Sequence, residues 1–287
     1  MTHARPVVSK IPVPRQLFRG ERRPLIALVG LPRGGKSTLF QAASSTAVES
    51  GCLEGSALPY ATSRINVGLE QADLVDLPSV RTFHDLAEAD RRVLMALVGG
   101  QPGKGGFKAP DLLIQVVDAT ALEPNLALSQ ELCELGKPLV IALNRLDEAR
   151  EKGIYVNVPA LSEALGVPVV PTVAHMGKGI AGLFETALAT LRAGTCPLPQ
   201  SPGAHLRKAL APLGEILGQP AVAAAFQVPR TLLLTQLAKG DTGFGAEMAR
   251  CFPALMPAVE EARAEAARAL PRPLAEELFA DRHYRTA

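Results

Sequence analysis

The chain has 287 residues, of which 47% are hydrophobic and 20% charged, and its formal net charge is +2. This composition is typical of a globular protein of one large or two modest domains, and the small net charge gives no reason to expect a nucleic-acid partner. No stretch approaches the roughly 18 apolar residues that a membrane-spanning helix needs, so we expect no transmembrane segment.

The N-terminal 22 residues are rich in arginine and interspersed with proline, and they contain no apolar core segment. A secretory signal peptide requires such a segment. The pattern favours a basic, flexible arm over residues 1–22.

From residue 23 to 194, short apolar runs alternate with segments of helical pattern. The runs predict six strands, at 24–30, 62–70, 72–77, 111–119, 138–144 and 167–172. Helical segments between them include 36–45, 125–135 and 158–165. The alternation predicts an α/β fold, with a mostly parallel six-stranded sheet, helices on both faces and ligand at the carboxyl ends of the strands. The glycine-rich stretch 99–110 is expected to be a flexible loop.

The amino-acid composition changes after residue 194. A proline-containing linker leads into a sequence rich in alanine, leucine and glutamate, in which the apolar residues recur at helical spacing. Segments 256–270 and 273–284 have the pattern of amphipathic helices. We expect a small all-α domain over 203–287, and it contains no group of side chains typical of a catalytic site.

The first chemical motif, "GLPRGGKST", follows the first strand directly. Gly30, Gly35, Lys36 and Ser37 have P-loop spacing, in which backbone N–H groups surround phosphate at a helix N-terminus. Lys36 then reaches the β- and γ-phosphates and the Ser37 hydroxyl binds Mg²⁺. The nucleotide contacts expected from this loop are Gly30, Leu31, Pro32, Arg33, Gly34, Gly35, Lys36, Ser37 and Thr38.

A second acidic anchor for the magnesium ends the strand at 72–77. Asp76 can hold the ion through water. No glutamine comes after the Asp76–Ser79 motif, because the next residue is Val80. Since nothing obvious orients an attacking water, we expect slow hydrolysis.

The base-binding motif is N-x-x-D, with Asn144 and Asp147 at the carboxyl end of a strand. A carboxylate there can accept the N1–H and the exocyclic amine of guanine, which adenine cannot offer. The alternative is a helix N-cap aspartate beside a turn asparagine. Further base contacts are expected from Arg145 and from the segment Val173, Ala174 and His175, where the Ala174 N–H would meet guanine O6.

These motifs, together with the runs "VVDATALEPNL", "ALNRLDEA" and "LGVPVVPTVAHMGKGI", resemble the cytosolic N-terminal GTPase region of the bacterial ferrous iron transporter FeoB family. The resemblance covers roughly Pro24 to the C-terminus. It implies a P-loop, Ras-like GTPase (G) domain at 23–194, a helical domain at 203–287, and binding of GTP or GDP with Mg²⁺. It also implies that Thr62 is the switch-I threonine that caps Mg²⁺ in the triphosphate state.

Three residues depart from the family pattern. Ser79 replaces the glycine of D-L-P-G, Val173 replaces the serine of P-T-S-A, and Arg33 stands where an asparagine helps related GTPases hold potassium. We therefore expect that potassium is not required. The residues expected to govern hydrolysis are Lys36, Arg33, Thr62 and Ser79, and those expected to hold magnesium are Ser37, Thr62 and Asp76.

The resemblance implies a slow GTPase that regulates or couples to ferrous iron uptake, as the cytosolic part or partner of a FeoB-type membrane permease. Such a protein would be cytoplasmic and peripheral at the inner membrane. Two alternatives stay open: a degenerate nucleotide-binding adaptor, in which Ser79 and Arg33 abolish switching, and a ribosome- or tRNA-associated GTPase of the same branch. The near-neutral charge counts against the latter.

Overall fold

A computed structural model describes residues 9–10, 23–52, 59–83, 86–98, 108–198, 202–226 and 228–286. Its contacts divide the chain into two units, Met1–Leu198 and Pro199–Ala287. Two segments expected to be flexible lie largely outside the described residues: the arm 1–22, apart from Ser9–Lys10, and the loop 99–110 up to residue 107. Ser9–Lys10 (β1) pairs antiparallel with Thr195–Cys196 (β9).

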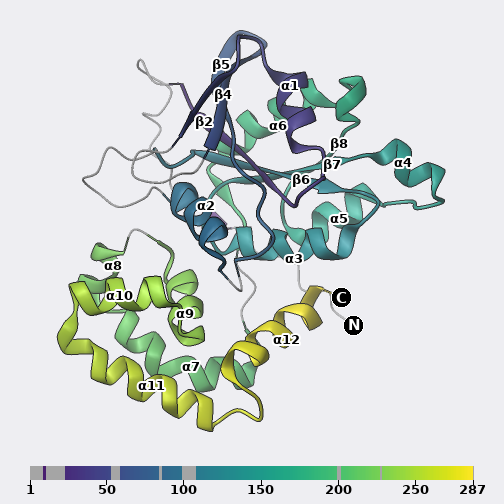
Figure 1. Cartoon of the computed structure of the whole chain (residues 1–287). Coiled ribbons are helices and arrows are strands. Elements are labelled where there is room, and N and C mark those ends of the chain that lie inside the picture. Colours follow the sequence, from purple (N-terminus) through teal and green to yellow (C-terminus); the bar gives the residue numbers. More distant parts are fainter. Residues whose placement is uncertain are drawn as a thin grey trace. The chain divides into compact units, whose positions relative to one another are not determined.

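The first unit is built on a seven-stranded sheet with the order β3–β4–β5–β2–β6–β7–β8 (Figure 1). Its strands are β2 (Leu25–Gly30), β3 (Glu49–Cys52), β4 (Pro59–Val67), β5 (Glu70–Asp76), β6 (Leu112–Asp118), β7 (Leu139–Asn144) and β8 (Val169–Pro171). Strands β5, β2, β6, β7 and β8 are parallel to one another. Strand β4 runs antiparallel to both of its neighbours, β3 and β5. The mostly parallel α/β sheet is as expected, but it has seven strands rather than six, because β3 contains no apolar run that would reveal it.

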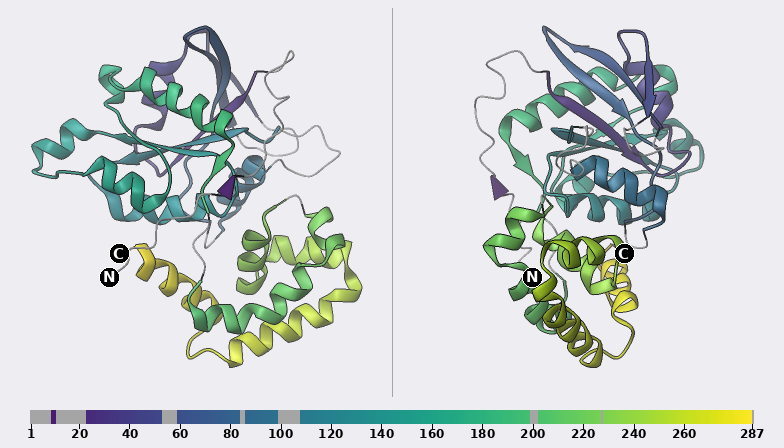
Figure 2. Two further views of the ribbon diagram at one scale, coloured as in Figure 1. Left: turned by 180° about the vertical axis from the view of Figure 1, so that it is seen from behind. Right: turned by 60° about the vertical axis from the view of Figure 1, so that its left-hand side comes forward.

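Helices cover both faces of this sheet, as Figures 1 and 2 show. One face carries α1 (Lys36–Ala43) and α6 (Ile180–Ala193), and the other carries α2 (Glu88–Val98), α3 (Leu122–Cys133) and α5 (Val158–Leu165). Because β6 and β7 are covered on both sides, all but the last residue of β6 and the whole of β7 are buried. The core between the sheet and α1 and α6 consists of aliphatic side chains with Phe40 and Phe184.

The second unit is all-helical. It comprises α7 (Ala204–Leu217), α8 (Pro220–Ala225), α9 (Arg230–Lys239), α10 (Thr242–Cys251), α11 (Met256–Arg268) and α12 (Leu274–Thr286). Helix α7 packs against α9 and α11, and α9 also packs against α10 and α12. Gly240 ends α9 at φ 79°, and the carboxylate of the next residue, Asp241, caps α10 by accepting from Phe244 N at 2.9 Å.

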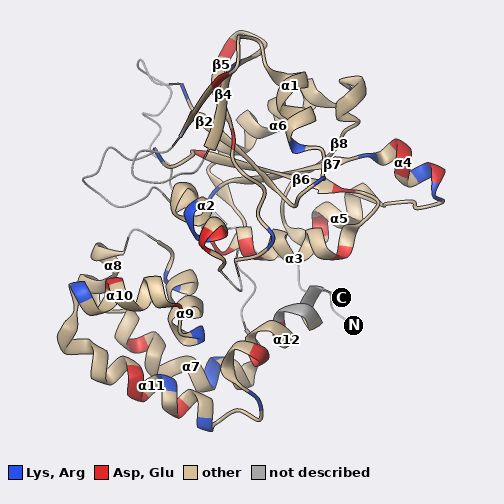
Figure 3. Ribbon diagram, viewed as in Figure 1, with Lys and Arg blue, Asp and Glu red and all other residues tan. Residues whose placement is uncertain are grey.

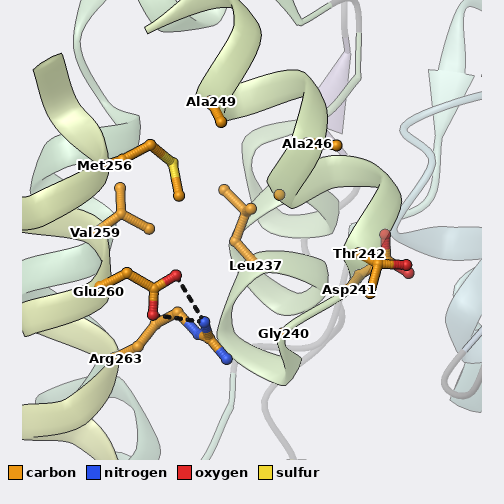
Figure 4. A pocket seen from close by; sticks show the side chains of 11 residues that line it. Leu237, Gly240, Asp241, Thr242, Ala246, Ala249, Met256, Val259, Glu260 and Arg263 are labelled. Carbon is orange, nitrogen blue, oxygen red and sulfur yellow. Dashed lines mark hydrogen bonds and ion pairs between the residues drawn. The ribbon is translucent and has the colours of Figure 1, made fainter. Parts of the chain in front are cut away.

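A pocket of about 370 Å³ lies between the end of α9, α10 and α11 (Figure 4). Its walls are mainly apolar, including Leu237 and Met256, and the Glu260–Arg263 ion pair lies at one end. Acidic and basic residues are mixed along α11 rather than segregated (Figure 3). Arg263 pairs with Glu260 three residues earlier in α11, and Arg250 pairs with Glu247 in the same way in α10. None of the helices in the described ranges has the length and apolar character needed to cross a membrane.

Candidate nucleotide site

The phosphate loop connects β2 to α1, with strand before and helix after it as the motif requires. Gly30 ends β2 against β6, where a Cβ atom would lie 2.7 Å from the Val116 carbonyl oxygen. Gly35 caps α1 with φ 89°, and Arg33 has φ 66°. The loop therefore contains two residues in the left-handed region and turns tightly at the N-terminus of α1, where backbone N–H groups favour an anion.

Lys36, Ser37 and Asp76 are brought together at the carboxyl ends of β2 and β5. The buried Lys36 donates from Nζ to Asp76 Oδ1 and to the Leu77 carbonyl oxygen. Ser37 Oγ donates to Asp76 Oδ2 at 3.0 Å. The neighbouring positions Leu31, Pro32, Arg33 and Thr38 are partly or fully exposed, as suits groups that meet a ligand.

Asn144 joins the phosphate loop to the base-binding loop. Its side chain is 3% exposed and donates from Nδ2 to the Gly34 carbonyl oxygen at 3.1 Å. Its Oδ1 accepts from Ala174 N at 3.0 Å and from Thr172 Oγ1 at 3.4 Å. We expected the Ala174 N–H to face guanine O6, but in this structure that group is engaged in holding the Asn144 amide.

Asp147 presents an unpartnered oxygen at the same edge of the sheet. Its Oδ1 atom is buried without a hydrogen-bond partner, whereas Oδ2 lies 3.5 Å from His175 Nε2. Buried carboxylate oxygens are rarely left unpaired, because burial removes the water that would otherwise bind them. An acceptor of this kind fits the two donors on the edge of guanine.

Sequence reasoning missed Asp118, which ends β6 beside Asn144 of β7. Its Oδ2 accepts from Arg145 Nη1 at 3.1 Å, and its Oδ1 accepts from the N–H and hydroxyl of Thr120, both at 2.8 Å. Arg145 itself has left-handed backbone, φ 60°, at the N-cap of α4 (Leu146–Glu151). Asp118 directly follows a buried apolar run in the sequence, and this position at the end of a predicted strand could have marked it as a candidate site residue.

Thr62 is not brought to this centre. It lies inside β4 opposite Val75, whereas Asp76 is opposite Ala61. Because side chains alternate between the faces of a sheet, Thr62 and Asp76 point to opposite sides. Ser79 is exposed two residues beyond Leu77, and Val173 is bridged to Lys178 through two backbone hydrogen bonds of 3.0 and 3.2 Å.

The oxygen atoms of Ser37 and Asp76 fit the binding of a magnesium ion that is held partly by phosphate. Ser37 Oγ and the Asp76 carboxylate are hard oxygen ligands lying within hydrogen-bond distance of each other. Mg²⁺ commonly uses one or two such protein ligands and completes its shell with water and phosphate oxygens. In the part of the chain that the structure describes, no three His, Cys, Asp or Glu side chains gather into another metal site.

A family model described as ferrous iron transport protein B matches residues 25–187. The chain belongs to the ferrous iron transport protein B family. Among FeoB relatives, the Fe(2+) transporter FeoB of Escherichia coli (strain K12) is 36% identical over 161 residues, which are 55% of this chain and 20% of the relative. A Fe(2+) transport protein A/Fe(2+) transporter FeoB fusion protein of Porphyromonas gingivalis is 34% identical over 163 residues, 57% of this chain and 18% of the relative. The match therefore spans about a fifth of these relatives' length.

Solved structures of FeoB cytosolic regions match nearly the whole chain. A mutant S. thermophilus NFeoB bound to GDP has a TM-score of 0.78 at 25% identity, covering 92% of this chain and 96% of that one. The cytosolic domain of L. pneumophila FeoB has a TM-score of 0.72 at 25% identity, covering 91% and 96%. The FeoB resemblance and the Ras-like fold followed by helices are thus confirmed.

Proposed function

We propose that this chain is a magnesium-dependent GTPase that hydrolyses GTP slowly and regulates or couples to ferrous iron uptake. Its G domain would occupy residues 23–194 and its helical domain 203–287. The GDP in the S. thermophilus structure and the transporter names of the relatives support the proposal. In that role the protein would act at the cytoplasmic face of the inner membrane, as the cytosolic part or partner of a FeoB-type permease.

The observation that carries the proposal is the buried, unpartnered Oδ1 of Asp147. Asn144 fixes the loop that bears it to the phosphate loop, through the Gly34 carbonyl. A nucleotide whose phosphates lie over Lys36 and Ser37 would thus have its base near a carboxylate acceptor. Guanine satisfies that acceptor with two N–H donors, whereas adenine leaves it unpaired.

Phosphate binding would exchange the contacts of Lys36. In this structure its ammonium group is held by Asp76 and the Leu77 carbonyl, and a phosphate oxygen would compete with them for the same charge. Ser37 and Asp76 would then hold Mg²⁺, which neutralises charge on the β- and γ-phosphates when it is bound.

Replacing Asp147 tests the guanine assignment. Asp147→Asn turns the carboxylate acceptor into an amide, so GDP affinity should fall by about 100-fold or more, while xanthosine diphosphate should gain affinity. Titration with fluorescent nucleotides measures both. Glu151→Gln, an exposed change at the end of α4, serves as the matched control and should leave both affinities unchanged. If Asp147→Asn binds GDP as the wild type does, the guanine site is placed wrongly.

A nucleotide-binding adaptor is the second candidate, and Ser79 favours it. Serine cannot take the positive φ of the glycine it replaces as readily, so the contact to a γ-phosphate would be weaker. Phosphate release from GTP with Mg²⁺, measured over hours, separates the two candidates. Slow release above the uncatalysed rate supports the GTPase, and binding without release supports the adaptor.

Potassium dependence tests the role of Arg33, which lies exposed in the phosphate loop at φ 66°. We propose that its guanidinium supplies the positive charge that potassium provides in related GTPases. GTP turnover should then change less than about twofold when sodium replaces potassium, whereas Arg33→Asn should become stimulated by potassium. A strong stimulation of the wild type by potassium would contradict this role.

A further inference from the structure

The segment Leu77–Phe83, which follows Asp76, is tied to the phosphate loop at its start. Lys36 Nζ donates to the Leu77 carbonyl, and Val80 N donates to the Gly30 carbonyl at 3.1 Å. Leu77 and Val80 are both buried, and Ser79 lies exposed between them. Ser79 thus lies between two contacts with the phosphate loop, and it shifts relative to that loop if the contact at Val80 loosens.

The far end of the segment is held by Glu131, from α3. Glu131 Oε1 accepts from Thr82 Oγ1 at 2.7 Å, and Oε2 accepts from Phe83 N at 2.5 Å. The Glu131 side chain is 4% exposed, so both oxygens of a buried carboxylate serve two successive residues. Asp90 of α2 adds a longer bond from Arg81 N at 3.4 Å, and burial raises the pKa of its carboxyl.

Two effects make a glutamate unfavourable at position 131. Burying a carboxylate removes it from water, and the negative charge lies two residues from Cys133, where α3 ends and the helix dipole disfavours anions. Stability of α3 alone thus gives no reason for a glutamate here. What the carboxylate provides is a fixed place for the backbone at Thr82 and Phe83.

We propose that Glu131 is a positioning residue for GTP hydrolysis. From α3 it holds Leu77–Phe83 so that the Ser79 N–H keeps its place beside the phosphate loop. The inference rests on the proposed GTPase function. Because serine lacks the conformational freedom of glycine, its backbone must be placed by the contacts on either side of it. Before Ser79, Lys36 holds the Leu77 carbonyl; after it, the Gly30 carbonyl holds Val80 and Glu131 holds Thr82 and Phe83.

Hydrogen exchange of the nucleotide-free protein tests the anchor without turnover. Glu131→Ala removes both acceptors, so amide exchange over residues 77–83 should rise by about 10-fold or more. Glu131→Gln should keep most of the protection, because its amide oxygen can accept from Phe83 N while its NH₂ group donates to Thr82 Oγ1. Ser129→Ala is the matched control, since Ser129 is equally buried on α3 but bonds within the helix to the Asn125 carbonyl at 3.1 Å.

Single-turnover hydrolysis at saturating GTP tests the consequence. Glu131→Ala should lower the rate by about 10-fold, with GDP affinity within about threefold of the wild type, because the nucleotide contacts are untouched and only Ser79 is displaced. Glu131→Gln should stay within about threefold in rate. Thr82→Val removes the hydroxyl donor and keeps the Phe83 bond, so it should show a smaller loss of the same kind, and it carries the test if Glu131→Ala does not fold.

Each outcome decides one of the two proposals. A wild type that binds no GDP contradicts the proposed function, and the exchange experiment then still decides whether Glu131 anchors the segment. The inference is overturned if Glu131→Ala shows the same amide exchange and the same turnover as the wild type. If Glu131→Ala does not fold, the same result in Thr82→Val overturns it. The inference is also overturned if Glu131→Gln or Ser129→Ala loses as much protection and turnover as Glu131→Ala. Loss of charge would explain the first result, and loss of α3 stability would explain the second.

Discussion

Gly35 and Arg33 both have left-handed backbone in the phosphate loop, but they differ in what requires it. A Cβ atom at Gly35 would lie 2.3 Å from Asn144 Nδ2, so any side chain there displaces the amide that joins the two halves of the site. Arg33 is exposed, and its left-handed conformation costs about 1 kcal/mol relative to glycine or asparagine. Glycine is thus demanded at one position, whereas arginine is tolerated at the other.

Gly35→Ala should therefore lose nucleotide affinity and lower the free energy of unfolding by about 1–3 kcal/mol. Urea unfolding and GDP titration measure the two effects. Gly182→Ala is the control, because a Cβ atom there meets nothing within 4 Å and Gly182 lies in helix α6, where alanine is favoured by about 0.5–1 kcal/mol. If Gly35→Ala retains full GDP affinity, the Asn144 contact does not constrain the site.

At the scale of elements, the ends of β6 and β7 are locked together by Asp118 and Arg145. Their ion pair of 3.1 Å links the residue that ends one strand to the N-cap of the helix that carries Asp147. The pair is partly shielded, with side chains 13% and 32% exposed. The pair thus joins the end of β6 to the start of the helix that bears Asp147, and we expect it to affect nucleotide binding through the position of that helix.

A double-mutant cycle measures this link. Asp118→Ala and Arg145→Ala should each weaken GDP binding by about 3- to 10-fold. The double variant should lose less than the product of the two single losses, because both residues share the ion pair, although Asp118 also bonds Thr120 and Arg145 also pairs with Glu148. GDP titration of the four proteins provides the data. Additive losses would show that the residues act independently.

The register of the β4–β5 hairpin places Thr62 away from Asp76 in this structure, and its expected role as the switch-I threonine of the triphosphate state stays a prediction. In the sequence, Thr62 matches the position of the family's switch-I threonine. The pairing of Ala61 with Asp76, however, decides which face of the sheet each side chain takes. A shift of one residue in this pairing would move every side chain of β4 to the other face of the sheet. Residues 53–58, just before β4, lie outside the described part of the chain.

All strands of the central sheet except β3 could be predicted, because apolar runs are local signals. The same holds for the residues of the short motifs, Lys36, Ser37, Asp76, Asn144 and Asp147. Glu131 and Asp118 could not be assigned in the same way. Glu131 contacts residues 48 and 49 positions away, and Asp118 contacts Arg145 across two strands. Contacts of this kind depend on how elements pack. Asp118 lies in one of the runs that carry the family resemblance, but the run does not indicate that its partner is Arg145, and Glu131 belongs to no such run.

At the scale of the whole molecule, buried titratable groups make stability depend on pH. Burial raises the pKa of the Cys133 thiol to about 12. An exposed thiol titrates near 8.5, so the unfolded chain loses this proton first, and the stability from the neutral buried thiol is lost as pH rises above that value. Burial lowers the pKa of Lys137, which acts in the opposite direction because the unfolded chain then binds more protons.

Comparison with Cys133→Ala isolates the thiol, because Lys137 is present in both proteins. Between pH 9 and 10 the free energy of unfolding of the wild type should fall, relative to Cys133→Ala, by up to about 1.4 kcal/mol. Urea unfolding at pH 8, 9 and 10 measures the difference. A difference that does not change with pH would mean that the Cys133 thiol ionises equally in the folded and unfolded chain.

The two outer strands of the sheet also affect how copies of the molecule behave toward one another. Exposed strand edges offer unpaired N–H and C=O groups to which another chain can add, and this is a common route to aggregation. Here one edge is β3, four residues that include Glu49 and Gly51, and the other is β8, three residues that end in Pro171, which has no N–H to donate. Both edges are short, and β8 also lacks a donor at Pro171, so we expect the sheet beneath the candidate nucleotide site to resist growth into larger β-assemblies.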